Sequence, residues 1–151
     1  MENEIMVLLV EPEGQPREAT VLVTEDGLAA VLGAGPLEAS GVRRNARSGA
    51  VLTSVAMVCR REIILAARNI PPDEGGYPGP VILCGLDGGG ALVSLPPYLM
   101  EAYQRVLECH GSGILRDGGL GTIGFLGRGQ ASLIGRWQFP LHFDAKGGVR
   151  I

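Results

Sequence analysis

The stretch GPVILCGLDGGGALVSLPPYLMEAYQRVL, residues 79–107, decides the fold. Residues 81–86 are a short apolar run with Pro80 before it, which is typical of a buried strand. The Asp-Gly-Gly-Gly sequence of residues 87–90 supplies the positive φ angles of a hairpin turn, and residues 91–95 return as the second strand. A phosphate-binding loop is the alternative interpretation of these glycines, but it requires a helix directly after them, and a strand follows.

A helix is expected after this hairpin, over about residues 96–109. Pro96 and Pro97 suit its first turn, where a missing N–H leaves no hydrogen bond unmade. One apolar stripe recurs at helical spacing, formed by Leu99, Tyr103, Val106 and Leu107. We expect this principal helix to lie across the sheet.

The N-terminal third predicts two strands and a short helix. Residues 5–10, IMVLLV, predict a central strand, and residues 18–24 predict a strand antiparallel to it. Thr24 is expected to cap a helix over residues 25–32, which Gly33 ends.

The middle of the chain predicts a hairpin. Strands are expected over residues 36–42 and 50–60, with an exposed polar loop or hairpin tip over residues 41–48. Residues 61–67 predict either a short helix or a continuation of the second strand.

Glycine is frequent after residue 111, where each interior position would cost a helix about 1 kcal/mol relative to Ala. Short strands are expected instead over residues 122–126, 131–139, 141–143 and 149–151, with the last two paired. The 151-residue chain is thus predicted to be a single α+β domain with an antiparallel or mixed sheet. Its core would span residues 1–110, with residues 111–151 packed on it as a Gly-rich β-hairpin extension.

The cysteines and the N-terminal residues indicate the cellular compartment in which the protein is expected. Cys59 and Cys84 lie in strand-like runs and predict buried free thiols, and with Cys109 they indicate a reducing compartment. Glu2 and Glu4 stand where an export signal would be basic. No apolar run reaches the roughly 18 residues that a membrane span needs. We therefore expect a cytoplasmic protein, in a host cell, without a membrane partner.

Positive charge is concentrated in a few segments, although the net charge of the chain is −3. Residues 43–71 contain six arginines and one Glu, and Lys146 is the only lysine. Arginine binds phosphate and carboxylate through paired hydrogen bonds that lysine does not make. The net charge of the chain does not favour nonspecific nucleic-acid binding, but it is compatible with a local basic face.

Seven residues are candidates for binding an anionic ligand, because arginine holds phosphate while a neighbouring aromatic ring stacks on a base. If the hairpin forms, Arg43 and Arg44 lie at the opposite end of it from Arg60 and Arg61, unless the sheet curls. In the alternative interpretation the arginines are scattered and only keep an apolar sheet soluble. The full set is Arg43, Arg44, Arg60, Arg61, Arg128, Arg136 and Trp137.

Other chemistry has weaker support. Residues 119–124 formally match the Gly-x-Gly-x-x-Gly pattern of dinucleotide sites, with Asp144 twenty positions later, but no helix is predicted after them. Cys109 and His110 are neighbours at a helix end and point about 100° apart, so they do not readily share a ligand. His142 is expected on the outer face of a strand. No cofactor, metal or catalytic residue is predicted.

Three segments and their order carry a family resemblance. They are VLLVEP (residues 7–12), AMVCRRE (56–62) and PGPVILCGLD (78–87), the last followed by GALVSL and a helix. Over about residues 5–107 this order resembles an uncharacterised family of small phage and mobile-element proteins. Residues 41–50, Pro96 and Pro97 depart from the family pattern. The resemblance implies a phage or mobile-element origin and an α+β fold, and it assigns no catalytic residue.

We expect a non-enzymatic binding protein that sequesters an anionic, nucleotide-like small molecule, such as a host immune signal. It would have a pocket lined by several of the arginines. Protein–protein interaction, as an assembly component or an inhibitor of a host protein, is the alternative and predicts a flat apolar patch. A small hydrolase is the third possibility and predicts a histidine beside a carboxylate in a cleft. The apolar content of 46% and exposed strand edges favour a homo-oligomer.

Overall fold

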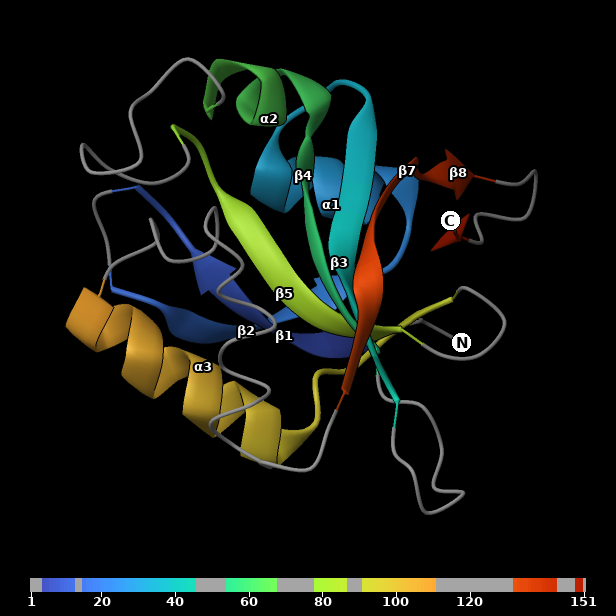
Figure 1. Cartoon of the computed structure of the whole chain (residues 1–151). Coiled ribbons are helices and arrows are strands. Elements are labelled where there is room, and N and C mark those ends of the chain that lie inside the picture. Colours follow the sequence, from blue (N-terminus) through green and yellow to red (C-terminus); the bar gives the residue numbers. More distant parts are fainter. Residues whose placement is uncertain are drawn as a thin grey trace.

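The computed structural model describes residues 4–12, 15–45, 54–67, 78–86, 91–110, 132–143 and 149–150. These residues form an α+β fold built on a seven-stranded sheet (Figure 1). The helices are α1 (Glu25–Leu32), α2 (Arg61–Ala67) and α3 (Pro97–His110). The strands are β1 (Glu4–Val10), β2 (Arg17–Leu22), β3 (Leu37–Asn45), β4 (Ser54–Arg60), β5 (Val81–Leu86), β6 (Leu92–Val93), β7 (Ser132–Pro140), β8 (His142–Phe143) and β9 (Val149–Arg150).

Strand β5 lies at the centre of the sheet, whose order is β2-β1-β5-β4-β3-β7. Leu83 of β5 is opposite Leu8 on one side and Met57 on the other. All six residues of β5 are buried, which explains why the strand is apolar throughout. The hairpin expected from the sequence is confirmed by the antiparallel pairing of β5 with β6. Every strand pairing among the described residues is antiparallel.

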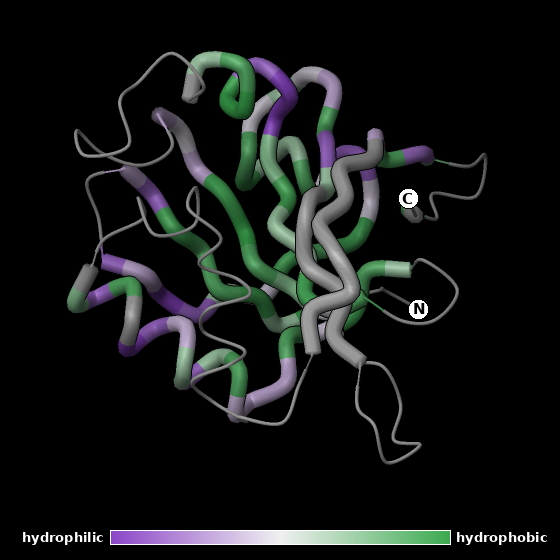
Figure 2. The backbone as a smooth tube through the Cα atoms, in the orientation of Figure 1, coloured by the Kyte–Doolittle hydropathy of each residue, from purple (hydrophilic) through white to green (hydrophobic). Residues whose placement is uncertain are grey.

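Two apolar clusters cover the two faces of the sheet, and Figure 2 shows the hydrophobic middle of the sheet between them. The α3-side cluster joins Leu8, Met57 and Leu83 of the strands to Tyr103 of α3. The α1-side cluster joins Val7, Val58 and Ile82 to Leu28 and Leu32 of α1. Successive residues of a strand point to opposite faces, so each central strand contributes to both clusters.

The helices follow the sequence predictions closely. Thr24 caps α1, since its side-chain oxygen accepts a hydrogen bond of 2.9 Å from the Gly27 N–H. The expected stripe of α3 is buried at Leu99, Tyr103 and Leu107, and Met100 joins it. Helix α2 contributes Ile63 and Ile64 to the α3-side cluster, so residues 61–67 do not continue the strand.

None of the helices in the described part of the chain is both long and apolar enough to span a membrane.

The loop predicted over residues 41–48 is wrong for residues 43–45, which extend β3 beyond the strand predicted over residues 36–42. Arg43 pairs with β4 on one side and β7 on the other, and residues 44–45 pair with β7, so backbone pairing holds this polar segment in the sheet in spite of its composition. The predicted pairing of residues 141–143 with 149–151 is confirmed by β8 and β9. The turn at residues 87–90 and the strand expected over residues 122–126 lie outside the described residues.

Strand β7 is the edge strand beside β3 (Figure 1). Leu141, which follows it, and Val149 belong to the α1-side cluster. The Leu141 N–H also donates to the Leu37 carbonyl oxygen at 3.0 Å. The described C-terminal segments therefore share the sheet and the core of the preceding chain.

Candidate functional site

A pocket of about 200 Å³ lies where the turn after α1 meets the end of β4 and the start of α2. We call it the Arg60 pocket. It contains two of the predicted ligand-binding arginines and one carboxylate beside them. Its lining residues are Ala34, Gly35, Pro36, Arg60, Arg61, Glu62 and Leu65.

The turn that forms one wall depends on two glycines. Gly33 has a φ of 97° and Gly35 a φ of 133°, a region that favours glycine over residues with a side chain. A Cβ added at Gly33 would lie 3.1 Å from Nε of Arg60, so the arginine packs directly against the turn. The Arg61 N–H donates to the Pro36 carbonyl oxygen at 2.9 Å and joins the turn to α2.

Arg60 is the central residue of the pocket. Its side chain is 25% exposed and its Nη1 forms an ion pair with Glu62, whose side chain is 67% exposed. Its Nε is buried and has no hydrogen-bond partner among the described residues. The guanidinium group has five N–H donors, so it retains donor capacity beyond the Glu62 contact.

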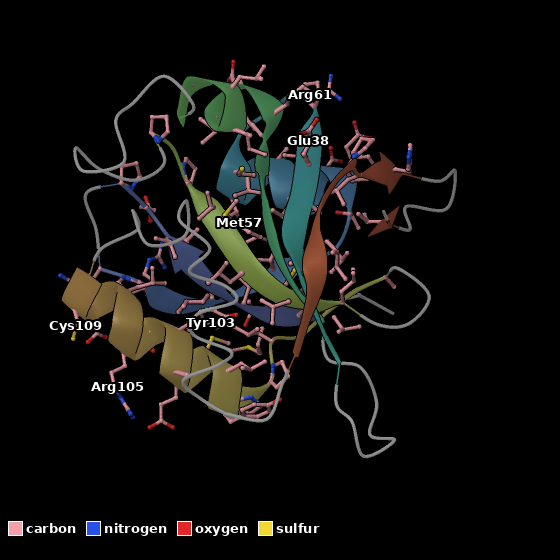
Figure 3. All side chains as sticks on the ribbon, viewed as in Figure 1. Glu38, Met57, Arg61, Tyr103, Arg105 and Cys109 are labelled. Carbon is pink, nitrogen blue, oxygen red and sulfur yellow. The ribbon has the colours of Figure 1, made fainter. Side chains whose placement is uncertain are left out.

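Arg61 is held by a second carboxylate. Its Nε donates to Oε2 of Glu38 at 2.6 Å, and the side chain of Glu38 is only 10% exposed. Figure 3 shows Glu38 and Arg61 together at one end of the sheet. Two guanidinium groups therefore face two carboxylates here, of which Glu38 is enclosed and Glu62 is open to solvent.

The other predicted ligand-binding residues lie elsewhere. Arg43 of β3 is opposite Ser54 of β4, and Leu37 of β3 is opposite Arg60 of β4. Leu37 and Arg43 are six residues apart along β3. At about 3.4 Å per residue this separation is roughly 20 Å. Antiparallel pairing thus places Arg43 and Arg44 at the far end of the hairpin from Arg60, as the sequence indicated.

Two further candidates lie on β7, beside the middle of β3. The backbone of Arg136 in β7 is opposite Val42, and that of Trp137 is opposite Gly41. Arg43 is opposite Gly135, next to Arg136, and the register shifts between Arg43 and Arg44. The described candidates therefore do not converge on one site: Arg60 and Arg61 lie at one end of the hairpin and Arg43 and Arg44 at the other, while Arg136 and Trp137 lie beside the middle of β3. Arg128 lies outside the described residues, as do residues 119–124 and Asp144.

The sequence predicts that Gly33 ends a helix, but it assigns no role in the site to the glycine turn, Glu38 or Glu62. The pattern Gly33-Ala34-Gly35-Pro36 between a helix and a strand was a usable signal for the turn. The contact of Glu38 with Arg61 joins residues 23 positions apart, and it follows from the pairing of β3 with β4.

The cysteines in the strands are structural. Burial raises the pKa of Cys84 to about 12. Burial, with a smaller contribution from the Glu38 carboxylate, also raises the pKa of Cys59 to about 12, against an opposing effect of Arg60. Both thiols are protonated near neutral pH and are poor nucleophiles. Within the described ranges, no three His, Cys, Asp or Glu side chains are grouped closely enough to hold a metal ion.

Alkylation with iodoacetamide at pH 8 is expected to modify Cys109 alone in the native protein and all three cysteines after denaturation. Cys109 is exposed, whereas Cys59 and Cys84 are buried thiols. With pKa values of about 12, only about one thiol in 10⁴ at each buried position is a thiolate at pH 8. Mass spectrometry counts the adducts, and rapid modification of Cys59 or Cys84 in the native protein would contradict their burial.

Comparisons of the chain with protein-family models, curated proteins and solved structures gave no significant match.

Proposed function

We propose that this protein is a non-enzymatic binding protein that holds the anionic group of a small molecule in the Arg60 pocket. The observation that carries the proposal is the buried Nε of Arg60, which has no hydrogen-bond partner in the described part of the chain. An unpaired buried donor costs about 1–3 kcal/mol, and more when the group is charged. Because this Nε atom has almost no accessible surface, a phosphate or carboxylate would reach it only when the Arg60 side chain moves into the pocket. There two oxygens of the ligand would accept from the Nε and Nη groups of the guanidinium and remove this cost.

The ion pairs in the pocket allow a ligand anion to replace Glu62 as the partner of Arg60. Glu62 is 67% exposed, and surface ion pairs of this kind contribute about 0–1 kcal/mol. A ligand anion therefore displaces Glu62 at little cost. Arg61 is instead fixed by the enclosed carboxylate of Glu38, so it is oriented before a ligand arrives.

The size and lining of the pocket limit the ligand. A volume of about 200 Å³ lies below the roughly 300–1,000 Å³ typical of sites that enclose a whole drug-sized ligand. The pocket suits the anionic end of a nucleotide-like molecule, and the remainder would lie across the apolar wall of Ala34, Pro36 and Leu65. Leu65 is 49% exposed and provides a contact surface for it.

The family resemblance of the sequence gives the proposal a biological setting. A phage or mobile-element protein that sequesters a nucleotide-derived signal of the host cell acts by binding alone. Such a protein needs no acid–base residues at its site, and the pocket wall consists of two arginines, one glutamate and apolar or small residues.

Thermal-shift measurements with inorganic phosphate, AMP, ADP-ribose and cyclic dinucleotides test the proposal. A ligand at 100 times its Kd adds about 2.7 kcal/mol of stability, which raises Tm by several degrees in a protein of this size. Arg60→Gln is expected to abolish the shift. Glu62→Gln is expected to strengthen binding by about two- to fivefold, because it removes the competing carboxylate.

Two control variants locate the site. Arg105→Gln changes an exposed arginine on α3 that pairs with Glu101, and it is expected to leave the shift unchanged. Arg43→Gln tests the group at the far end of the hairpin and is expected to do the same. A shift that survives Arg60→Gln but is lost in Arg43→Gln would place the ligand at β3 and β7, and a complete absence of shifts would refute the proposal.

A further inference from the structure

We propose that the Arg60 pocket binds an oxyanion with a single negative charge, which in a nucleotide-like ligand is a phosphodiester, more tightly than a phosphomonoester with two charges. This inference rests on the proposed function and adds the chemical class of the ligand. It follows from the charges around the pocket. Among the described residues that line it, only Arg60, Arg61 and Glu62 are charged, and the Glu38 carboxylate contacts Arg61 from β3.

The positive charge of Arg61 is already neutralised by Glu38. Its Nε donates to Oε2 of Glu38 at 2.6 Å, and the Glu38 side chain is only 10% exposed. Removing one partner of an enclosed ion pair leaves an uncompensated charge in a poorly solvated site, which is strongly destabilising. A ligand anion therefore does not displace Glu38, and this pair contributes no net charge to the pocket.

The positive charge of Arg60 is the one that a ligand can neutralise. Its present partner, Glu62, is 67% exposed, so the Glu62 carboxylate can turn into solvent and remain hydrated. That carboxylate is itself an oxyanion with a single charge, and it contacts Nη1 of Arg60. A singly charged ligand therefore replaces Glu62 without changing the net charge beside Arg60.

A second negative charge on the ligand would find no further cation among the described lining residues. A phosphomonoester carries close to two charges at about pH 7.5, since its second pKa is about 6. Arg60 neutralises one of them. The other would lie near the Glu38 carboxylate, because Glu38 is opposite Cys59, the residue before Arg60 in β4. Like charges repel more strongly in a partly buried site than in water, so the second charge weakens binding.

Isothermal titration calorimetry of the full chain with cyclic AMP and AMP tests this preference. The two nucleotides share the base and the ribose and differ in the charge on the phosphate. At about pH 7.5 cyclic AMP is expected to bind about tenfold more tightly than AMP. At about pH 5.5 most AMP carries a single charge, so the two Kd values are expected to differ by less than about twofold. Taking the ratio of the two Kd values at each pH removes effects of pH on the protein that are common to both ligands.

Glu38→Gln tests whether the charges cause the preference. Glutamine keeps an oxygen that accepts from the Arg61 Nε but removes the negative charge, so Arg61 can neutralise the second charge of AMP. The preference for cyclic AMP at about pH 7.5 is expected to fall below about threefold, with an unchanged circular dichroism spectrum. Glu101→Gln is the matched control, because it removes the same charge from the exposed pair with Arg105 on α3 and is expected to leave the preference unchanged.

The outcomes separate this inference from the proposed function. If AMP binds as tightly as cyclic AMP at about pH 7.5, or if folded Glu38→Gln leaves the preference unchanged, the single-charge inference is wrong. The proposed function then still stands, provided that Arg60→Gln abolishes binding. If neither nucleotide binds, or if binding survives Arg60→Gln, the proposed function is refuted and this inference with it. If Glu38→Gln does not fold, the pH series of the wild-type chain decides.

Discussion

Replacing Tyr103 by Ala is expected to lower the free energy of unfolding by about 3–5 kcal/mol. Tyr103 is 1% exposed and is the largest fully buried side chain in the described part of the chain, and it joins α3 to Leu8, Met57 and Leu83 of the sheet. In Figure 3 its side chain lies between α3 and the strands. Its loss leaves a cavity where the principal helix contacts the core.

Urea denaturation followed by circular dichroism measures this change. Domains of this kind have a total stability of about 5–15 kcal/mol, so the variant retains only part of it. Glu101→Ala, on the exposed face of the same helix, is the control and is expected to change stability by less than about 0.5 kcal/mol. A loss below 1 kcal/mol for Tyr103→Ala would show that α3 does not anchor the fold in this way.

Replacing Gly27 by Ala is expected to lower stability by about 2 kcal/mol, although Ala is the better helix former. Gly27 lies in the first turn of α1, where a Cβ would be 2.3 Å from the carbonyl oxygen of Leu22 and 2.7 Å from its Cβ. Helix propensity favours Ala by about 1 kcal/mol. The clash involves backbone, which cannot rotate away as a side chain would, so it exceeds the propensity gain.

Ala30→Gly separates the two effects. Ala30 is exposed in the same helix, and the change is expected to cost about 1 kcal/mol through propensity alone. Propensity by itself predicts opposite signs for Gly27→Ala and Ala30→Gly, whereas the structure predicts that both destabilise. Chemical denaturation of the two variants decides between these predictions, and an increase in stability for Gly27→Ala would contradict the close contact with Leu22.

Local sequence patterns predicted the elements themselves well. The apolar run of residues 81–86 marked the buried central strand, and Thr24 and Gly33 marked the two ends of α1. The helical spacing of Leu99, Tyr103 and Leu107 identified the buried face of α3. Each of these features depends on residues that are close together in the chain, so it can be predicted from the sequence alone.

The candidate site was only partly predictable. The sequence predicts Arg60 and Arg61 as ligand-binding residues, but it predicts four other arginines and Trp137 with them and does not show which of the seven lie together. The pocket needs the glycine turn before β3 and the ion pairs to Glu38 and Glu62 as well. The separation of Arg60 and Arg61 from the other described arginines follows from the register of β3 with β4 and β7.

The sequence by itself determined which segments form helices and strands and which of their faces are apolar, because hydrophobic periodicity and capping are local. Only the tertiary structure decided that β5 inserts between β1 and β4, that residues 43–45 extend β3, and that β2 is left at an edge. The reason is that strand pairing forms hydrogen bonds between backbone groups that are distant in the chain. Because every residue has the same backbone groups, local sequence patterns do not specify which strands pair.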